Sequence, residues 1–119
     1  MEIPLSKPCL GEEEKRAVLE VLDSGFLARG RQTECFEEEF ARYIGVKEAI
    51  ATSSGTSALF VALKALGVGE GDRVVTTPFT FVATASAIVQ CGGIPVFCDV
   101  DESTFNLDPA SLEDILKRE

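Results

Sequence analysis

From residue 48 onward, short apolar segments alternate with helix-forming segments, and this alternation constrains the fold more than any other feature. Strands are predicted at residues 48–52, 73–77 and 95–100, and helices at 56–66, 80–91 and from 109 to the last residue. Such an order favours a parallel sheet with right-handed crossovers. The predicted strands are apolar on both faces, as in a sheet that helices cover on both sides. The sequence therefore predicts an α/β fold, a three-layer sandwich with a mostly parallel sheet.

The first 47 residues lack this alternation. An extended arm comes first, and it is followed by a helix predicted at residues 12–23, a loop at 25–31 and an amphipathic helix at 32–44. Three parallel strands make a small sheet that leaves an edge and much helix surface uncovered. We therefore expect residues 1–31 to form an arm, helix and loop. Residues 32–119 are expected to form the first part of a larger domain.

Composition excludes several classes of partner. The chain has 119 residues and a net charge of −9, from 20 acidic and 11 basic side chains, so neither nucleic acid nor an anionic membrane would attract it. Four cysteines without a CxxC pair, and no histidine, predict no metal site and reduced thiols, hence a cytoplasmic protein. The N-terminus does not resemble a signal peptide, and the apolar stretches are too short to cross a membrane.

The segment Thr52-Ser-Ser-Gly-Thr-Ser57 lies between a predicted strand and a predicted helix. A helix start offers free backbone N–H groups and the positive end of the helix dipole, which together bind anions. Gly55 lets the backbone approach a ligand, and the hydroxyls can donate hydrogen bonds. Without a lysine or the required glycine spacing, the segment is neither a P-loop nor a dinucleotide motif. It predicts a phosphate monoester held by uncharged donors or, alternatively, a cluster that only caps a buried helix.

The second predicted strand ends in Thr76-Thr-Pro-Phe-Thr-Phe-Val-Ala-Thr84. In open parallel sheets, ligands bind outside the carboxyl ends of the strands. If both strand ends face one crevice, an aromatic ring lies near the phosphate turn, an arrangement that suits a flat phosphorylated cofactor. The alternative for Phe79 and Phe81 is ordinary core packing.

Short segments along nearly the whole chain resemble the N-terminal part of the DegT/DnrJ/EryC1/StrS family of sugar aminotransferases, which are fold-type I pyridoxal-phosphate (PLP) enzymes. The segments are residues 3–8, 24–30, 36–43, 51–59, 69–78, 80–84, 92–101 and 104–109. The resemblance implies the N-terminal portion of the PLP-binding large domain, and it implies a homodimer.

The resemblance also implies site residues. Gly55 and Thr56 would bind the cofactor phosphate through backbone N–H groups and the threonine hydroxyl, and Phe81 would stack on the pyridine ring. The loop at residues 24–30 would lie near the active-site mouth and the partner subunit. Arg31 replaces a proline often found in the family, so no substrate role is carried over to it.

No catalytic residue is expected in this chain. The resemblance implies that the Schiff-base lysine and the acid that pairs with the pyridinium nitrogen lie beyond Glu119, while lysines such as Lys64 are expected only to solvate the surface. The whole enzyme would transfer an amino group from a donor such as glutamate to a nucleotide-linked keto-sugar, in amino-sugar or cell-surface polysaccharide biosynthesis. The chain alone would be inactive. The alternatives are a non-catalytic module that binds a phosphorylated ligand or a protein, and a fragment of a related PLP sugar dehydratase.

Overall fold

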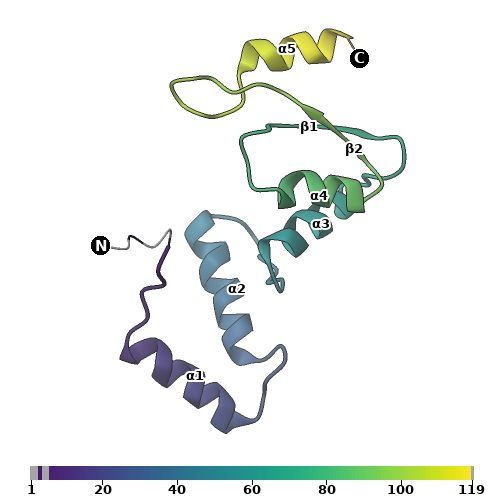
Figure 1. The fold of residues 1–119 in the computed structure, drawn as a ribbon. Coiled ribbons are helices and arrows are strands. Elements are labelled where there is room, and N and C mark those ends of the chain that lie inside the picture. The colour runs from purple at the N-terminus through teal and green to yellow at the C-terminus, as the bar shows by residue number, and fades with distance from the viewer. Residues whose placement is uncertain (1–2, 4–5, 119) are drawn as a thin grey trace. The chain divides into compact units, whose positions relative to one another are not determined.

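The computed structural model describes residue 3 and residues 6–118, and the chain divides after Ala51 into two compact units. The first unit contains helices α1 (Glu12–Ser24) and α2 (Arg31–Ile44). The second unit contains α3, β1, α4, β2 and α5 in that order (Figure 1). Their bounds are Gly55–Ala65 for α3, Arg73–Thr76 for β1, Ala83–Gln90 for α4, Ile94–Phe97 for β2 and Pro109–Arg118 for α5.

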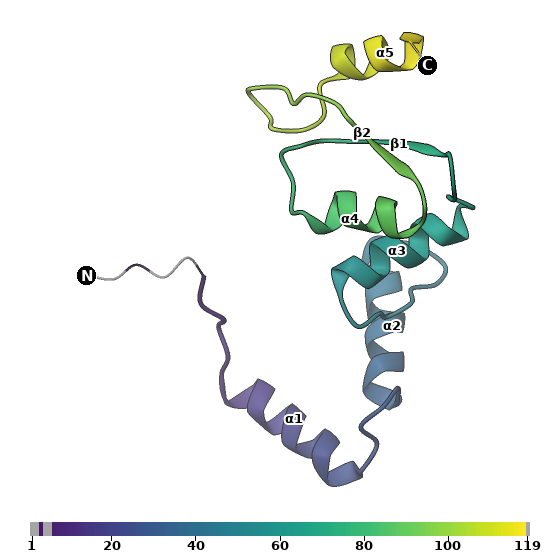
Figure 2. The same ribbon diagram turned by 45° about the vertical axis from the view of Figure 1, so that its right-hand side comes forward.

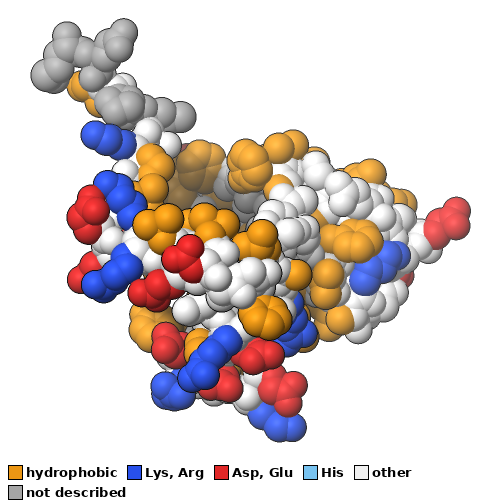
Figure 3. Space-filling model, turned by 90° about the horizontal axis from the view of Figure 1, so that it is seen from below, with side chains coloured by type: hydrophobic (Ala, Val, Ile, Leu, Met, Phe, Trp, Pro, Cys, Tyr) orange, Lys and Arg blue, Asp and Glu red, His pale blue; other side chains and the backbone are white. Residues whose placement is uncertain are grey.

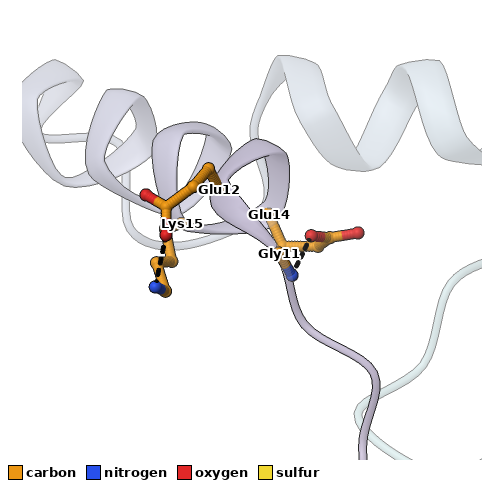
Figure 4. Close-up of polar contacts among 4 residues, drawn as sticks. All are labelled: Gly11, Glu12, Glu14 and Lys15. Atoms are coloured by element: carbon orange, nitrogen blue, oxygen red, sulfur yellow. Dashed lines mark hydrogen bonds and ion pairs between the residues drawn. The ribbon is translucent and has the colours of Figure 1, made fainter.

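Local polar contacts define the two helices of the first unit. At the start of α1, the Gly11 N–H donates to Glu14 Oε2 at 2.7 Å, and Lys15 Nζ lies 2.6 Å from Glu12 Oε1 (Figure 4). Acidic side chains in this first turn complement the positive end of the helix dipole. Gly25 ends α1 and Gly45 ends α2, each with a positive φ that glycine adopts without steric cost.

The prediction of a strand at residues 48–52 is wrong. Within the described part of the chain these residues belong to no strand, and the Ala51 N–H donates to a carboxylate of α2, Glu37 Oε1, at 2.8 Å. In the described part of the chain the sheet therefore has two strands, β1 and β2, and not the predicted three.

The second unit is a layered α/β structure. Strands β1 and β2 are parallel, with Arg73 paired to Ile94 and Thr76 to Phe97. Helices α3 and α4 contact each other, and α4 contacts both strands. Helix α5 lies on the opposite side of the strands from α3 and α4 in both ribbon views (Figures 1 and 2). This arrangement confirms the predicted α/β class.

Small side chains fill the space between α4 and the sheet. The buried apolar residues of this unit are Ala83, Ala87, Ile88, Cys91 and Cys98. Gly93 fits where a larger residue would not, since a Cβ there would lie 3.1 Å from Ile88 Cγ2 and 3.3 Å from the Asp72 carbonyl oxygen. Close packing therefore fixes the turn that leads from α4 into β2.

Two element boundaries differ from the prediction, and one boundary confirms it. Helix α4 begins at Ala83, three residues after the predicted start, and β2 ends at Phe97 because Val100 instead bridges Leu107 in an antiparallel pair. The start of α5 is confirmed, since the Asp108 carboxylate accepts the N–H groups of two residues in its first turn.

Large apolar side chains remain exposed in both units, and some are visible on the face in Figure 3. No helix within the described residues is long and apolar enough to cross a membrane.

Candidate functional site

The hydroxyl-rich turn forms the start of α3, as its sequence predicts. Ser54 is the N-cap, and its Oγ accepts the Ser57 N–H at 3.1 Å while its carbonyl accepts the Ala58 N–H at 3.0 Å. The N–H groups in the first turn of a helix have no acceptor within the helix. Those of Gly55 and Thr56 have no partner among the described residues either. Two adjacent N–H groups are thus available at the positive end of an 11-residue helix.

The space beside Gly55 is open. A Cβ at this position would meet no heavy atom within 4 Å, and its φ lies outside the left-handed region. The backbone conformation of the turn therefore does not require glycine at position 55. Because Gly55 has no side chain, however, the backbone there is accessible to a ligand. Two N–H donors, the Thr56 hydroxyl and the helix dipole form a donor set that fits a phosphate group.

The three cofactor-binding residues predicted from the resemblance lie around one pocket. This open pocket between the starts of α3 and α4 has a volume of about 620 Å³ and is lined by Gly55, Thr56, Ala58, Leu59, Ala62, Phe81, Ala83 and Thr84. No charged side chain lines it. The end of the pocket at Gly55 and Thr56 therefore offers only neutral donors, and its remaining walls are mostly apolar.

Core packing does not explain the two phenylalanines after β1. The side chain of Phe79 is 65% exposed and that of Phe81 is 76% exposed. Phe81 lies at the edge of the pocket, whereas Phe79 contacts another exposed ring, that of Phe105. Both rings are accessible to a ligand, and within the described part of the chain neither is packed in a core.

A buried carboxylate that the sequence analysis missed organises the first unit. Glu37 is 9% exposed, and its two oxygens accept the Ala51 N–H at 2.8 Å and Arg29 Nη2 at 2.9 Å. The hydrogen bond from Ala51, together with the Arg29 charge, lowers the pKa of Glu37. Arg29 belongs to the loop at residues 24–30, which lines a second pocket of about 700 Å³. Glu37 therefore fixes this loop and residue 51 to the same helix.

No pattern in the sequence indicated this contact. Phe36 and Phe40 form an apolar stripe on α2, yet they are 57% and 45% exposed, and the buried face carries Glu37 and Ala41 instead. The described residues include no cluster of three His, Cys, Asp or Glu side chains that could hold a metal ion.

Comparison with known proteins identifies the family of this chain. The sequence pattern of the DegT/DnrJ/EryC1/StrS aminotransferase family matches residues 8–119. The chain belongs to this family. Among curated proteins, it is 50% identical over 111 residues to the spore coat polysaccharide biosynthesis protein SpsC of Bacillus subtilis. That match covers 93% of this chain but 28% of SpsC.

Solved structures of aminotransferases have the same fold as this chain over nearly its whole length. An aminotransferase from Psychrobacter cryohalolentis matches with a TM-score of 0.86 and 45% identity, covering 93% of this chain and 29% of that protein. Spr1654 of Streptococcus pneumoniae, assigned as a sugar aminotransferase and solved in its PLP form, matches with a TM-score of 0.89 and 33% identity. Here 96% of this chain and 29% of Spr1654 are covered. The fold-type I class implied by the resemblance is confirmed, and the chain spans less than a third of the length of these relatives.

Proposed function

We propose that this chain supplies the phosphate-binding part of a PLP-dependent sugar aminotransferase. The supporting observation is that Gly55, Thr56 and Phe81 lie around one pocket, and that the N–H groups of Gly55 and Thr56 have no partner among the described residues. Residues 32–119 would be the first part of the PLP-binding large domain, and residues 1–31 would be its arm, helix and loop. The whole protein would act as a homodimer in the cytoplasm.

Each of these residues has a definite task in this function. The N–H groups of Gly55 and Thr56, with the Thr56 hydroxyl, would hold the phosphate, and the dipole of α3 would stabilise its negative charge. The exposed ring of Phe81 would stack on the pyridine ring and fix its plane. PLP, when bound, supplies the chemistry that moves an amino group between two substrates. The cofactor-bearing lysine and the acid at the pyridinium nitrogen would come from residues beyond 119.

The proposed substrates are a nucleotide-linked keto-sugar and an amino donor such as glutamate. The name of SpsC includes polysaccharide biosynthesis, and Spr1654 is assigned as a sugar aminotransferase. Both relatives match almost the whole of this chain. The product would therefore be an amino sugar used to build a cell-surface polysaccharide.

Substitutions in the turn test the phosphate assignment, and the natural gene product that contains these residues is the protein to use. Gly55→Ala places a methyl group in open space, so the protein should fold normally while the ligand's approach is blocked. Loss of a hydrogen bond to a charged group costs about 1.5–3 kcal/mol. Absorbance titration should therefore show PLP affinity falling roughly tenfold or more in Gly55→Ala, and less in Thr56→Ala.

Two controls make this result specific. Pyridoxal, which lacks the phosphate, should bind both variants as it binds the wild type. Ser53→Ala alters the same turn, but the Ser53 hydroxyl is hydrogen-bonded to Ser57 and does not line the pocket, so PLP affinity should not change. Wild-type PLP affinity in both Gly55→Ala and Thr56→Ala would contradict the assignment.

A further inference from the structure

Phe105 has an unfavourable backbone conformation. Its φ is +59°, a left-handed value that is rare for a bulky residue and is found for no other non-glycine residue in the described part of the chain. Such strain persists only where the surroundings fix it, and it is concentrated at ligand-binding positions. An exposed side chain that merely fills space would not need it, and Phe105 is 59% exposed.

The loop around Phe105 is held rigidly by Asp101. One carboxylate oxygen of Asp101 accepts the N–H groups of Ser103 at 3.1 Å and Thr104 at 2.8 Å, as well as the Ser103 hydroxyl. The main chain of Asp101 adds two bonds, from the Phe105 N–H at 2.8 Å and to the Asn106 carbonyl at 2.9 Å. The Ser103 hydroxyl and the Thr104 groups lower the pKa of Asp101, which keeps this acceptor ionised. The backbone at Phe105 is therefore held in place before any ligand binds.

The ring of Phe105 pairs with a ring from the other strand end. Phe79 follows β1 and Phe105 follows β2, and their ring centroids lie 5.5 Å apart at an interplanar angle of 36°. Both rings are more than half exposed. We call Phe79 and Phe105 the aromatic platform.

The aromatic platform includes a residue that is near Phe81 in the chain. Because β1 and β2 are parallel, their carboxyl ends meet at one edge of the sheet, where ligands bind in open α/β folds. Phe79 precedes Phe81 by two residues, a length of chain that spans at most about 7 Å. A substrate that reaches the cofactor beside Phe81 therefore has a second part within reach of the platform.

We propose that the aromatic platform stacks against the base of the nucleotide-linked substrate. This inference rests on the proposed function, which supplies a nucleotide. Bases stack well on aromatic side chains, and they do so whatever their sequence identity because every base has a π face. The platform consists of two rings and offers no polar group to read the edge of a base. It would therefore accept different bases with similar affinity.

The test measures nucleotide binding to the natural gene product by calorimetry, with UDP, GDP and inorganic pyrophosphate as probes. Phe105→Asn removes the ring and suits the left-handed backbone, since asparagine tolerates that conformation. This variant should lower the affinity for UDP and GDP roughly tenfold or more and leave the affinity for pyrophosphate unchanged. The melting temperature should stay equal or rise. Phe105→Tyr retains a ring and should bind all three probes as the wild type does.

A second variant separates binding from folding. Phe79→Leu keeps an apolar side chain of similar bulk but removes the π face, so UDP affinity should fall while the melting temperature hardly changes. Wild-type UDP affinity in Phe105→Asn and Phe79→Leu would overturn the inference, as would an equal loss of pyrophosphate binding. PLP titration of the same samples keeps the two proposals apart. A wild-type protein that binds PLP but no nucleotide contradicts the platform alone, and one that does not bind PLP contradicts the proposed function.

Discussion

The two compact units differ in what holds them together. Up to Ala51, the buried residues in the described part are Glu37 and Ala41, and Glu37 connects two other segments through polar bonds. From Thr52 onward, two paired strands and a set of small apolar side chains form a layered core. The buried part of one unit thus contains a hydrogen-bonded carboxylate, whereas the buried part of the other is mainly close-packed apolar side chains.

This difference predicts different sensitivities. A close-packed core is sensitive to lost volume and indifferent to the charge of the solvent-facing side chains. A carboxylate network is sensitive to pH and to loss of its charge. The candidate phosphate turn and the aromatic platform both lie in the close-packed unit. A turn at the start of a regular helix, such as the candidate phosphate turn, can hold its donors in a fixed position before a ligand arrives.

The largest effect is expected from Ile88→Ala in the second unit. Ile88 is 3% exposed and lies against the position of Gly93, so truncation leaves a cavity between α4 and the turn into β2. Such a change lowers the free energy of unfolding by about 2–5 kcal/mol. Denaturant unfolding measures the loss, and hydrogen exchange should show faster opening of the β1 and β2 amides. Val89→Ala is the matched control, since Val89 is 60% exposed on the same helix and should change little.

A small effect of Ile88→Ala, equal to that of Val89→Ala, would break the comparison. It would mean that α4 does not depend on its buried face, and that packing is no more important in the second unit than in the first.

Much of this unit could be predicted from the sequence. Strand–helix alternation gave the α/β class and the helix that begins at residue 109, and the serine-rich turn gave the start of α3. These predictions hold because they depend on local patterns: capping residues, glycine ends and apolar runs. The three candidate cofactor residues came from the family resemblance, and the pocket brings them together.

Other features could not be predicted because they depend on contacts between distant residues. Residues 48–52 have the composition of a strand, but the Ala51 N–H is bonded to Glu37, 14 residues earlier in the sequence. The ring pair of Phe79 and Phe105 requires knowledge of which strand ends are neighbours. Lys64, expected only to solvate the surface, donates to the carbonyls of Val68 and Cys91. Patterns in single segments contain no information about such partners.

An intermediate effect is expected from Lys64→Met, which tests whether polar bonds also matter in the close-packed unit. Lys64 Nζ donates to the Cys91 carbonyl at 2.7 Å, at the end of α4, and to the Val68 carbonyl at 3.3 Å. Methionine keeps the apolar stem but removes these bonds, and the side chain is largely exposed, so we expect a loss of about 1 kcal/mol in unfolding free energy. Denaturant unfolding measures it. Lys117→Met, which removes only an exposed pair with Glu113, should cost less. Equal losses would show that Lys64 contributes no more than a surface ion pair.

The smallest effect is expected from Glu37→Gln, and it appears mainly as a change in pH dependence. The hydrogen bond from Ala51, with the charge of Arg29, places the pKa of Glu37 below its ordinary value of 4.5 in the folded chain. The stabilisation is therefore fully present above that ordinary value and is lost as the pH falls through the lower, folded pKa. Glutamine can still accept the Ala51 N–H, so the variant should fold at neutral pH but lose this acid response.

The amide NMR signal of Ala51 reports this titration directly. In the wild type its chemical shift should stay constant from pH 7 to about pH 5 and change at lower pH, as the carboxylate is protonated. In Glu37→Gln the change should disappear, whereas Glu38→Gln, on the exposed side of α2, should leave it intact. An Ala51 signal that titrates identically in wild type and Glu37→Gln would show that another group controls this amide. The first unit would then not depend on its buried carboxylate, and the contrast between a charge-dependent unit and a packing-dependent one would fail.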